Sequence, residues 1–201
     1  MFLLKYTIAM LAFIMITPIC SANTSTIKKD QTQAISHLPQ VSIKTDLGTF
    51  MVELYPKKAP LSVQNFLGYI DSGHYKGTIF HRVIAGFMVQ GGGLTYDFKK
   101  KDVGEPIKNE ADNGLLNQQF TLAMARTGDP DSATAQFFIN LVDNPHLDKS
   151  GQSAGYTVFG KVINGQEVIQ KIEKEPQGLY RAYPNAPNYA VRILEIGRIT
   201  P

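Results

Sequence analysis

Arg82 lies in the stretch FHRVIAGFMVQGG, residues 80–92, in which most of the neighbouring side chains are large and apolar. A charged side chain in such surroundings is costly unless it is paired or hydrated. Arg82 therefore lies either on the solvent face of a strand or at an apolar cleft where it meets a polar group. In a cleft, its permanent charge and its N–H groups can stabilise a lone pair that forms during a reaction.

The sequence lacks the other arrangements from which catalytic and cofactor sites are usually built. Residues 86–93 (GFMVQGGG) have the spacing of a phosphate-binding loop, but Gly92 stands where that loop requires lysine. There is no G-x-G-x-x-G unit between a strand and a helix, and there is no G-x-S-x-G nucleophile motif. We expect neither a metal nor a cofactor, because no H-x-x-x-H spacing occurs among His37, His74, His81 and His146. His81 is expected to be a structural histidine that is hydrogen-bonded in the fold.

One reaction needs neither a nucleophile nor a cofactor: rotation about the peptide bond that precedes proline. Amide resonance opposes this rotation with a barrier of about 18–20 kcal/mol. In the twisted state the prolyl nitrogen regains its lone pair, so a guanidinium aimed at this atom stabilises the twisted state more than the planar one. An apolar pocket must also hold the pyrrolidine ring. Arg82 and its apolar neighbours supply both requirements.

Short strands and two helices must position these residues. The segment TFMVELY, after Gly48, alternates apolar and polar residues as a half-buried strand does. From Pro60, apolar residues recur with the i, i+3, i+4, i+7 spacing of an amphipathic helix that Gly73 ends, and a shorter helical segment follows Gly165. The predicted strands are residues 41–46, 49–55, 78–84, 87–92, 120–126, 135–142, 156–163 and 190–199.

This succession of elements predicts a mainly β fold: a closed antiparallel eight-stranded β-barrel capped by two α-helices. A long connection over residues 94–118 is rich in Gly, Asn and Lys. Connections of this length in a compact domain are usually functional or packed by their own side chains.

The first 22 residues have the layout of a secretory signal peptide. Lys5 precedes the apolar run IAMLAFIMI, and small residues permit cleavage after Ala22. This run is too short for a bilayer span, which needs about 20 residues. Ile19, directly before Cys20, argues against a lipid anchor on the cysteine. We expect a signal peptide (1–22), a flexible polar lead-in (23–39) and one domain (40–201) in an exported protein.

Size and composition are those of a globular protein, with 201 residues, 43% of them hydrophobic and 18% charged. A net charge of +3 is too small to argue for a nucleic-acid partner. The lysine triplet at 99–101 lacks interleaved aromatic residues, which favours a solvated loop. We expect a monomer with no nucleic-acid partner and no membrane attachment after the signal is removed.

Three blocks, in order along the chain, resemble the cyclophilin family of peptidyl-prolyl cis/trans isomerases: FHRVIAGFMVQGG, AMARTGDPDSATAQFFIN and YTVFGKV. The resemblance runs from about Val41 to Thr200. The segment KNEADNG and the blocks around it resemble the Gram-negative branch of the family, and the signal-like N-terminus resembles its periplasmic members. It implies an isomerase of X-Pro bonds in unfolded or flexible polypeptides, which assists the folding of exported proteins in the periplasm.

The resemblance also assigns roles to residues of this chain. Arg82 matches the catalytic arginine. Four apolar residues match the proline pocket, two glutamines match groups that orient Arg82 and the substrate carbonyl, and the main chain of Arg126 matches the position that pairs with an extended substrate. The residues that match substrate-binding positions are Phe87, Met88, Gln90, Arg126, Gln136, Phe138, Leu147 and Tyr156.

This chain departs from the better-known eukaryotic cyclophilins at three positions. Arg126 stands in place of an asparagine, which leaves a main-chain role intact. Tyr156 stands in place of a histidine and still offers a hydroxyl and an aromatic face. His146 aligns with the tryptophan whose indole grips cyclosporin, and we therefore expect weak cyclosporin binding.

Two other readings of the same residues remain open. A peptide-binding chaperone module would need the apolar pocket but not the arginine, and its isomerase activity would be incidental. A purely structural barrel would leave the charged residue at the cleft without a purpose. The effect of Arg82→Ala on catalysis and on folding assistance distinguishes the first alternative from an isomerase.

Overall fold

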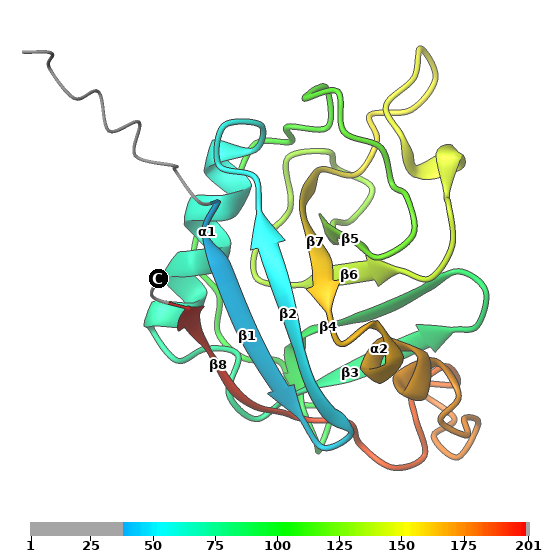
Figure 1. Cartoon of the computed structure of the whole chain (residues 1–201). Coiled ribbons are helices and arrows are strands. Elements are labelled where there is room, and N and C mark those ends of the chain that lie inside the picture. The colour runs from blue at the N-terminus through cyan, green and yellow to red at the C-terminus, as the bar shows by residue number, and fades with distance from the viewer. Residues whose placement is uncertain (1–37, 200–201) are drawn as a thin grey trace, which may run out of the picture. The chain divides into compact units, whose positions relative to one another are not determined.

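The computed structural model describes residues 38–199, in which alternating apolar residues build eight strands and two apolar stripes build two α-helices (Figure 1). Each predicted strand and helix is present, with small shifts at the ends. The strands are β1 Gln40–Thr45, β2 Gly48–Leu54, β3 Thr78–Ile84, β4 Met88–Thr95, β5 Thr121–Met124, β6 Phe137–Asn140, β7 Val158–Asn164 and β8 Ile193–Ile199. The helices are α1 Pro60–Asp71 and α2 Gln166–Glu173, with a short 3-10 helix, η1 Pro145–Leu147, that the sequence analysis did not predict.

The eight strands form one curled antiparallel sheet in the order β3-β4-β6-β5-β7-β2-β1-β8. The two edges of the sheet approach each other at a single antiparallel bridge between Ile79 of β3 and Arg192, the residue before β8. Beside it, the N–H of Gly77 donates to the carbonyl oxygen of Ile193 at 2.8 Å. No ladder of paired residues joins these two edges in the described chain, so the sheet is an open, curled half-barrel and the prediction of a closed barrel is not confirmed.

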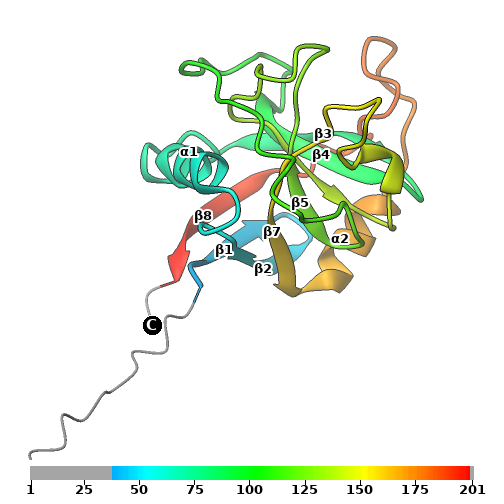
Figure 2. The same ribbon diagram turned by 90° about the horizontal axis from the view of Figure 1, so that it is seen from above.

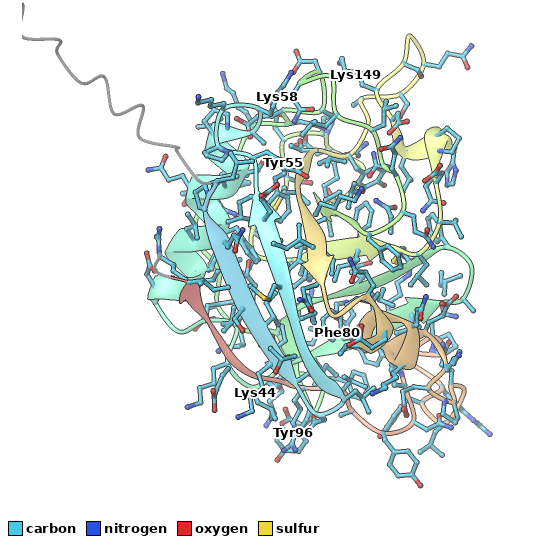
Figure 3. The ribbon with its side chains drawn as sticks, in the orientation of Figure 1. Lys44, Tyr55, Lys58, Phe80, Tyr96 and Lys149 are labelled. Carbon is cyan, nitrogen blue, oxygen red and sulfur yellow. The ribbon has the colours of Figure 1, made fainter. Side chains whose placement is uncertain are left out.

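The two helices lie on opposite sides of the curled sheet, as two perpendicular views show (Figures 1 and 2). Their apolar residues join the main core, which also contains the inward residues of the strands. An aromatic cluster occupies this core: the ring of Phe66, on α1, lies 5.2 Å from the rings of Tyr75 and Phe159 and 5.4 Å from the ring of Phe137. Phe80 lies within the fold, whereas Tyr96 and Lys44 lie at its periphery (Figure 3).

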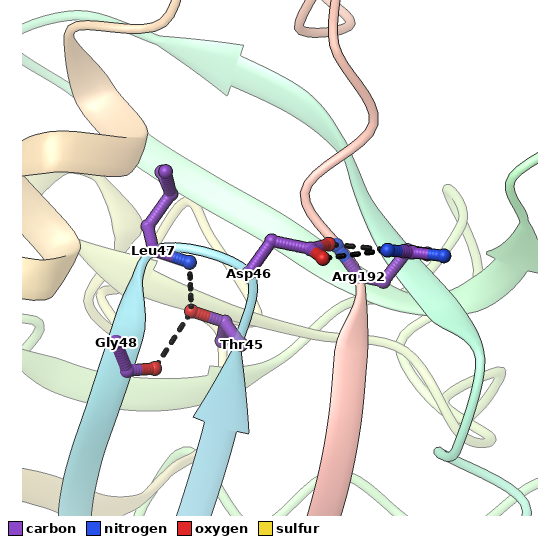
Figure 4. A network of polar contacts seen from close by, with 5 residues as sticks. All are labelled: Thr45, Asp46, Leu47, Gly48 and Arg192. Atoms are coloured by element: carbon purple, nitrogen blue, oxygen red, sulfur yellow. Dashed lines mark hydrogen bonds and ion pairs between the residues drawn. The ribbon is translucent and has the colours of Figure 1, made fainter.

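The turn between β1 and β2 is tied to the start of β8 (Figure 4). The Thr45 hydroxyl donates to the carbonyl oxygen of Gly48 at 2.8 Å and accepts from the N–H of Leu47 at 3.1 Å. Asp46 pairs with both sides of the Arg192 guanidinium, at 2.7 Å and 3.1 Å, and hydrogen bonding to Arg192 lowers the pKa of Asp46. Gly48 has a φ of +135°, and an added Cβ would lie 2.8 Å from Val168 on α2, so glycine is required here.

A carboxylate from the long connection between β4 and β5 caps helix α1. The N-cap residue, Ala59, offers no side-chain hydrogen bond. Instead, Glu110 accepts from the N–H groups of Leu61 and Ser62, both at 2.9 Å, and from the Ser62 hydroxyl at 2.8 Å. Such a cap satisfies N–H groups that a helix start leaves unpaired, and its charge complements the helix dipole. Glu110 thus ties the long connection to helix α1.

We expect Glu110→Ala to lower the free energy of unfolding by about 2 kcal/mol, because the N–H groups of α1 lose a charged acceptor. Glu110→Gln retains an acceptor oxygen and should lose less. Urea unfolding followed by circular dichroism measures both values. Glu105→Ala, an exposed change in the same connection, is the matched control. Equal midpoints for Glu110→Ala and Glu105→Ala would contradict the capping role.

The predicted signal peptide (1–22) and nearly all of the predicted lead-in (23–39) lie outside the described residues. Within residues 38–199, no helix is long and apolar enough to cross a membrane. The chain described from Leu38 enters β1 at Gln40, one residue before the start that the sequence predicts.

Candidate functional site

A cavity of about 160 Å³ opens between β3, β4, β6 and the segments that follow β5 and precede β7. Eight of the nine residues predicted for substrate binding and catalysis border it. These eight are Arg82, Phe87, Met88, Gln90, Arg126, Phe138, Leu147 and Tyr156, and Ala125 completes the lining. The ninth, Gln136, is not among the lining residues but accepts a hydrogen bond from Gln90, which is.

Arg82 reaches this cavity because of an irregularity in its strand. Phe80 and Val83 both enter the main core, although strict alternation along β3 would place them on opposite faces. The pairing of β3 with β4 shifts between Phe80 and Arg82, as at a β-bulge, and such bulges redirect side chains. Arg82 therefore turns outward while its neighbours stay buried. The sequence leaves two places open for Arg82, the solvent face of a strand or the edge of an apolar cleft. Both descriptions apply, since Arg82 is exposed and also borders an apolar pocket.

Two glutamines hold the Arg82 guanidinium in place. Arg82 Nη1 donates to Gln90 Oε1 at 3.2 Å, and Gln90 Nε2 donates to Gln136 Oε1 at 2.9 Å. Arg82 Nη1 also lies 4.0 Å from the sulfur of Met88. The guanidinium makes no ion pair within residues 38–199, so its other N–H groups are available to a ligand.

The apolar wall of the pocket is built from alternate residues of β4 and β6. Met88 and Phe138 are buried, with Ala123 and Val158, in a small cluster separate from the main core. Their strand neighbours Val89, Phe137 and Ile139 face the main core instead. The partly buried side chains that pack on this second cluster include Phe87, Leu147 and Tyr156. A pyrrolidine ring is of a size and polarity that such a wall accepts.

The opposite edge of the pocket is formed by Arg126 and Tyr156. The guanidinium carbon of Arg126 lies 4.3 Å from the centre of the Tyr156 ring, and Nε donates to the carbonyl oxygen of Gly155 at 3.1 Å. The Tyr156 ring meets that of Phe138 edge to face, with the ring centres 5.6 Å apart. Within the described residues, the main-chain N–H and carbonyl of Arg126 make no hydrogen bond, so both can pair with an extended ligand.

His146 lies beside the pocket rather than in it. Its ring stacks on Phe87, with the ring centres 5.5 Å apart and the planes 26° apart. It is exposed on the 3-10 helix η1, whose next residue, Leu147, borders the cavity. The imidazole is smaller than an indole and extends the apolar surface less.

Sequence reasoning missed the groups that hold these side chains. Asn144 donates to the carbonyl oxygen of Phe87 and to Asn140, at 2.9 Å and 2.8 Å, and Asn140 donates to Thr121 at 2.9 Å. All three are buried, so this network fixes the turn that carries Phe87. The only signal in the sequence was the pair of amide residues Asn140 and Asn144, at and just after the end of an apolar strand.

Gly93 is another residue whose contribution to the pocket the sequence analysis did not identify. A Cβ added at Gly93 would lie 2.6 Å from both Cδ and Nε2 of Gln136. The absence of a side chain at position 93 therefore lets Gln136 lie where it accepts from Gln90. Gly93 therefore affects the orientation of Arg82 indirectly, through the side-chain amides of Gln136 and Gln90.

His81 is buried next to Arg82, and its Nδ1 has no hydrogen-bond partner in the described chain. The expected hydrogen bond is thus absent at this nitrogen, although a hydrogen bond with the main chain of Ile79 acts to raise the pKa of the imidazole. Burial lowers the pKa of His81 to about 4, and the charge of Arg82 acts in the same direction. A neutral imidazole adds no charge to the pocket at neutral pH.

We expect the stability of the protein to fall as the pH falls from about 6.5 to about 4. In this window the unfolded chain protonates His81 and the folded chain does not, which costs up to about 3 kcal/mol. Urea unfolding across this range should give a smaller slope for His81→Phe. The slope should not vanish, because burial also lowers the pKa of His74. An identical slope in the variant would contradict a neutral, buried His81.

A family model described as cyclophilin type peptidyl-prolyl cis-trans isomerase/CLD matches residues 40–198. A peptidyl-prolyl cis-trans isomerase of Acinetobacter baylyi is 53% identical over 156 residues, which are 78% of this chain and 83% of that protein. The peptidyl-prolyl cis-trans isomerase A of Dickeya dadantii is 46% identical over 188 residues, 92% of either chain.

A solved structure has the same fold. It is the crystal structure of a cyclophilin type peptidyl-prolyl cis-trans isomerase of Cryptosporidium parvum in the presence of the dipeptide Ala-Pro. It matches with a TM-score of 0.67 and 29% identity, over 81% of this chain and 99% of that one.

Proposed function

The chain belongs to the cyclophilin family of peptidyl-prolyl cis-trans isomerases, and from this premise we propose that it accelerates rotation about X-Pro peptide bonds at the pocket beside Arg82. The observation that carries the proposal is a guanidinium, fixed by Gln90, at the rim of an apolar pocket of about 160 Å³. The pocket accommodates one proline ring. The guanidinium can then face the nitrogen of the same residue.

Catalysis in this proposal is differential binding of the twisted amide. As the C–N bond rotates, the prolyl nitrogen becomes pyramidal and its lone pair becomes a hydrogen-bond acceptor. An N–H group of Arg82 donates to that lone pair, which hardly exists in the planar amide. The apolar wall of Phe87, Met88 and Phe138 holds the ring, so that the acyl group of the preceding residue rotates about the C–N bond. A barrier lowered by about 7 kcal/mol would correspond to roughly a 10⁵-fold acceleration.

Other residues have supporting roles. Gln90 and Gln136 orient the guanidinium, Leu147 forms the floor of the proline pocket, and Tyr156 forms its rim. The main chain of Arg126 pairs with the extended substrate as an added strand would. These assignments are supported by the shared cavity lining and the hydrogen-bonded chain of amides.

Proton exchange spectroscopy on a short Ala-Pro peptide tests the activity. Uncatalysed exchange takes tens to hundreds of seconds. We expect catalytic amounts of the protein to bring exchange into a range where cross-peaks between the cis and trans signals appear. Unchanged exchange at substrate concentrations up to the millimolar range would refute the assignment.

Cyclosporin is expected to bind weakly, with a Kd far above the nanomolar range. His146 stacks on Phe87 and presents a smaller apolar surface than an indole at this position. A fluorescence or calorimetric titration measures the affinity, and His146→Trp should raise it. Nanomolar affinity in the unaltered protein would contradict the expectation.

We further propose that the protein is exported to the periplasm, where it acts as a monomer on proline-containing segments of unfolded proteins. The support is the charged start, apolar core and small-residue cleavage site of residues 1–22. Expression of the full chain in a Gram-negative host, followed by fractionation and mass measurement, tests export. A periplasmic product that begins at Asn23 is expected, and an uncleaved cytoplasmic product would refute it.

A further inference from the structure

Two guanidinium groups, those of Arg82 and Arg126, border the candidate pocket, and no Asp or Glu is among its lining residues. Neither arginine forms an ion pair within the described part of the chain. Only Arg82 is needed for the proposed rotation. The second cation at the same pocket therefore calls for a separate role.

Arg126 is held in a defined position at the pocket edge. Its guanidinium lies over the Tyr156 ring at 4.3 Å, Nε donates to the carbonyl oxygen of Gly155 at 3.1 Å, and Nη1 donates to the carbonyl oxygen of Thr127 at 2.9 Å. Nη2 makes no hydrogen bond with residues 38–199. A planar, half-buried cation held on three sides loses little conformational freedom when it binds a ligand.

Carboxylates on the segments that flank the pocket are engaged elsewhere. Asp148, after η1, accepts from the N–H of Asn117 at 2.7 Å. Glu173, at the end of α2, accepts from the N–H of Gly86 at 2.8 Å. Neither carboxylate lines the pocket, so the charged groups that a ligand meets first there are the two guanidinium groups.

We propose that this pocket selects prolyl segments that carry a carboxylate side chain directly before or directly after the proline, and that Arg126 is the specificity-determining residue. The inference rests on the proposed isomerase function. With the proline ring on the apolar wall and its amide facing Arg82, the flanking side chains of an extended segment pass the edge where Arg126 lies. A Glu or Asp side chain pairs there with the guanidinium, whereas a Lys or Arg side chain is repelled.

Peptides matched in everything but one side chain test the inference. The blocked peptides acetyl-Ala-Xaa-Pro-Ala-amide and acetyl-Ala-Ala-Pro-Xaa-amide, each with Xaa as Glu, Gln or Lys, separate the positions before and after proline. In at least one series, kcat/KM at low ionic strength should follow Glu, Gln, Lys in decreasing order, with about a threefold to fivefold step from Glu to Gln, as for a partly solvated ion pair. The step should shrink in about 0.5 M salt.

Three variants assign the effect to Arg126. Arg126→Met keeps an apolar stem and should bring the Glu-to-Gln ratio close to one, while Arg126→Lys should retain part of it. Arg181→Met removes the same charge from an exposed position outside the pocket lining and should keep the full ratio. Equal rates for all three peptides, or a ratio that survives Arg126→Met, would overturn the inference.

The neutral peptide separates this inference from the function on which it rests. If the unaltered protein does not accelerate exchange of the Gln peptide or of its Glu and Lys counterparts, the isomerase assignment itself fails. If it accelerates the Gln peptide but shows no preference for Glu, only the inferred selectivity fails.

Discussion

Replacing Arg82 with alanine should lower kcat/KM for an Ala-Pro peptide by about 100-fold to 1,000-fold, the range seen when a single transition-state donor is removed. The donor is lost, while the apolar wall that binds the ring remains. The free energy of unfolding should change little, because the Arg82 side chain is exposed and its hydrogen bonds reach only Gln90 and Met88. Proton exchange spectroscopy and urea unfolding measure the two quantities on the same sample.

Two further variants serve as controls for Arg82→Ala. Arg82→Lys keeps the charge but not the planar fork of donors, so it should recover only part of the lost rate. Arg181→Met removes an exposed arginine elsewhere and should retain the full rate. An Arg82→Ala protein that is folded and still isomerises at the unaltered rate would contradict the proposed mechanism. If Arg82→Ala loses isomerase activity but still assists the folding of a client whose prolines are all trans, peptide binding is a function in its own right.

Replacing Phe137 with alanine should lower the free energy of unfolding by about 3–5 kcal/mol, as for other large-to-small changes in a core. Phe137 is fully buried, and its ring meets those of Phe66, Tyr75 and Phe80 edge to face, with centres 5.4, 5.6 and 6.2 Å apart. The cavity left behind would lie at the centre of the aromatic cluster. Urea unfolding, with the slope checked for two-state behaviour, measures the loss.

The next residue on the same strand is the matched comparison. Phe138 faces the pocket, and Phe138→Leu keeps an apolar side chain of similar volume, so stability should fall by no more than about 1.5 kcal/mol. Its kcat/KM should fall, because the flat wall for the proline ring is lost. A large stability loss for Phe138→Leu with none for Phe137→Ala would contradict the assignment of the two faces of β6.

Local sequence patterns were sufficient for the secondary structure. The alternation of Phe50, Val52 and Leu54 placed β2, and the apolar stripe after Pro60 placed α1, because both patterns follow from which side of an element is buried. Closure of the sheet could not be predicted in this way. It depends on how far the twist of eight strands brings β3 toward β8, and the structure has one bridge there, Ile79–Arg192, in place of a ladder.

The site was predictable only in part from physical reasoning. The misfit of Arg82 among apolar residues pointed to the pocket, while Leu147 and Tyr156 came from family resemblance alone, because they lie far from Arg82 in the sequence. The support that Gly93 and Asn144 give to the pocket escaped prediction, because each acts on a residue distant in the chain, Gln136 and Phe87 respectively. A bulge that turns Arg82 outward has no signature in the alternation of β3 itself.

A crystal structure of this protein with a bound Ala-Pro dipeptide tests the central claim most directly. The account predicts that the pyrrolidine ring lies on Phe87, Met88 and Phe138, with a nitrogen of the Arg82 guanidinium about 3 Å from the prolyl amide group. A ring bound away from that wall, or a guanidinium turned toward bulk solvent in the complex, would contradict it.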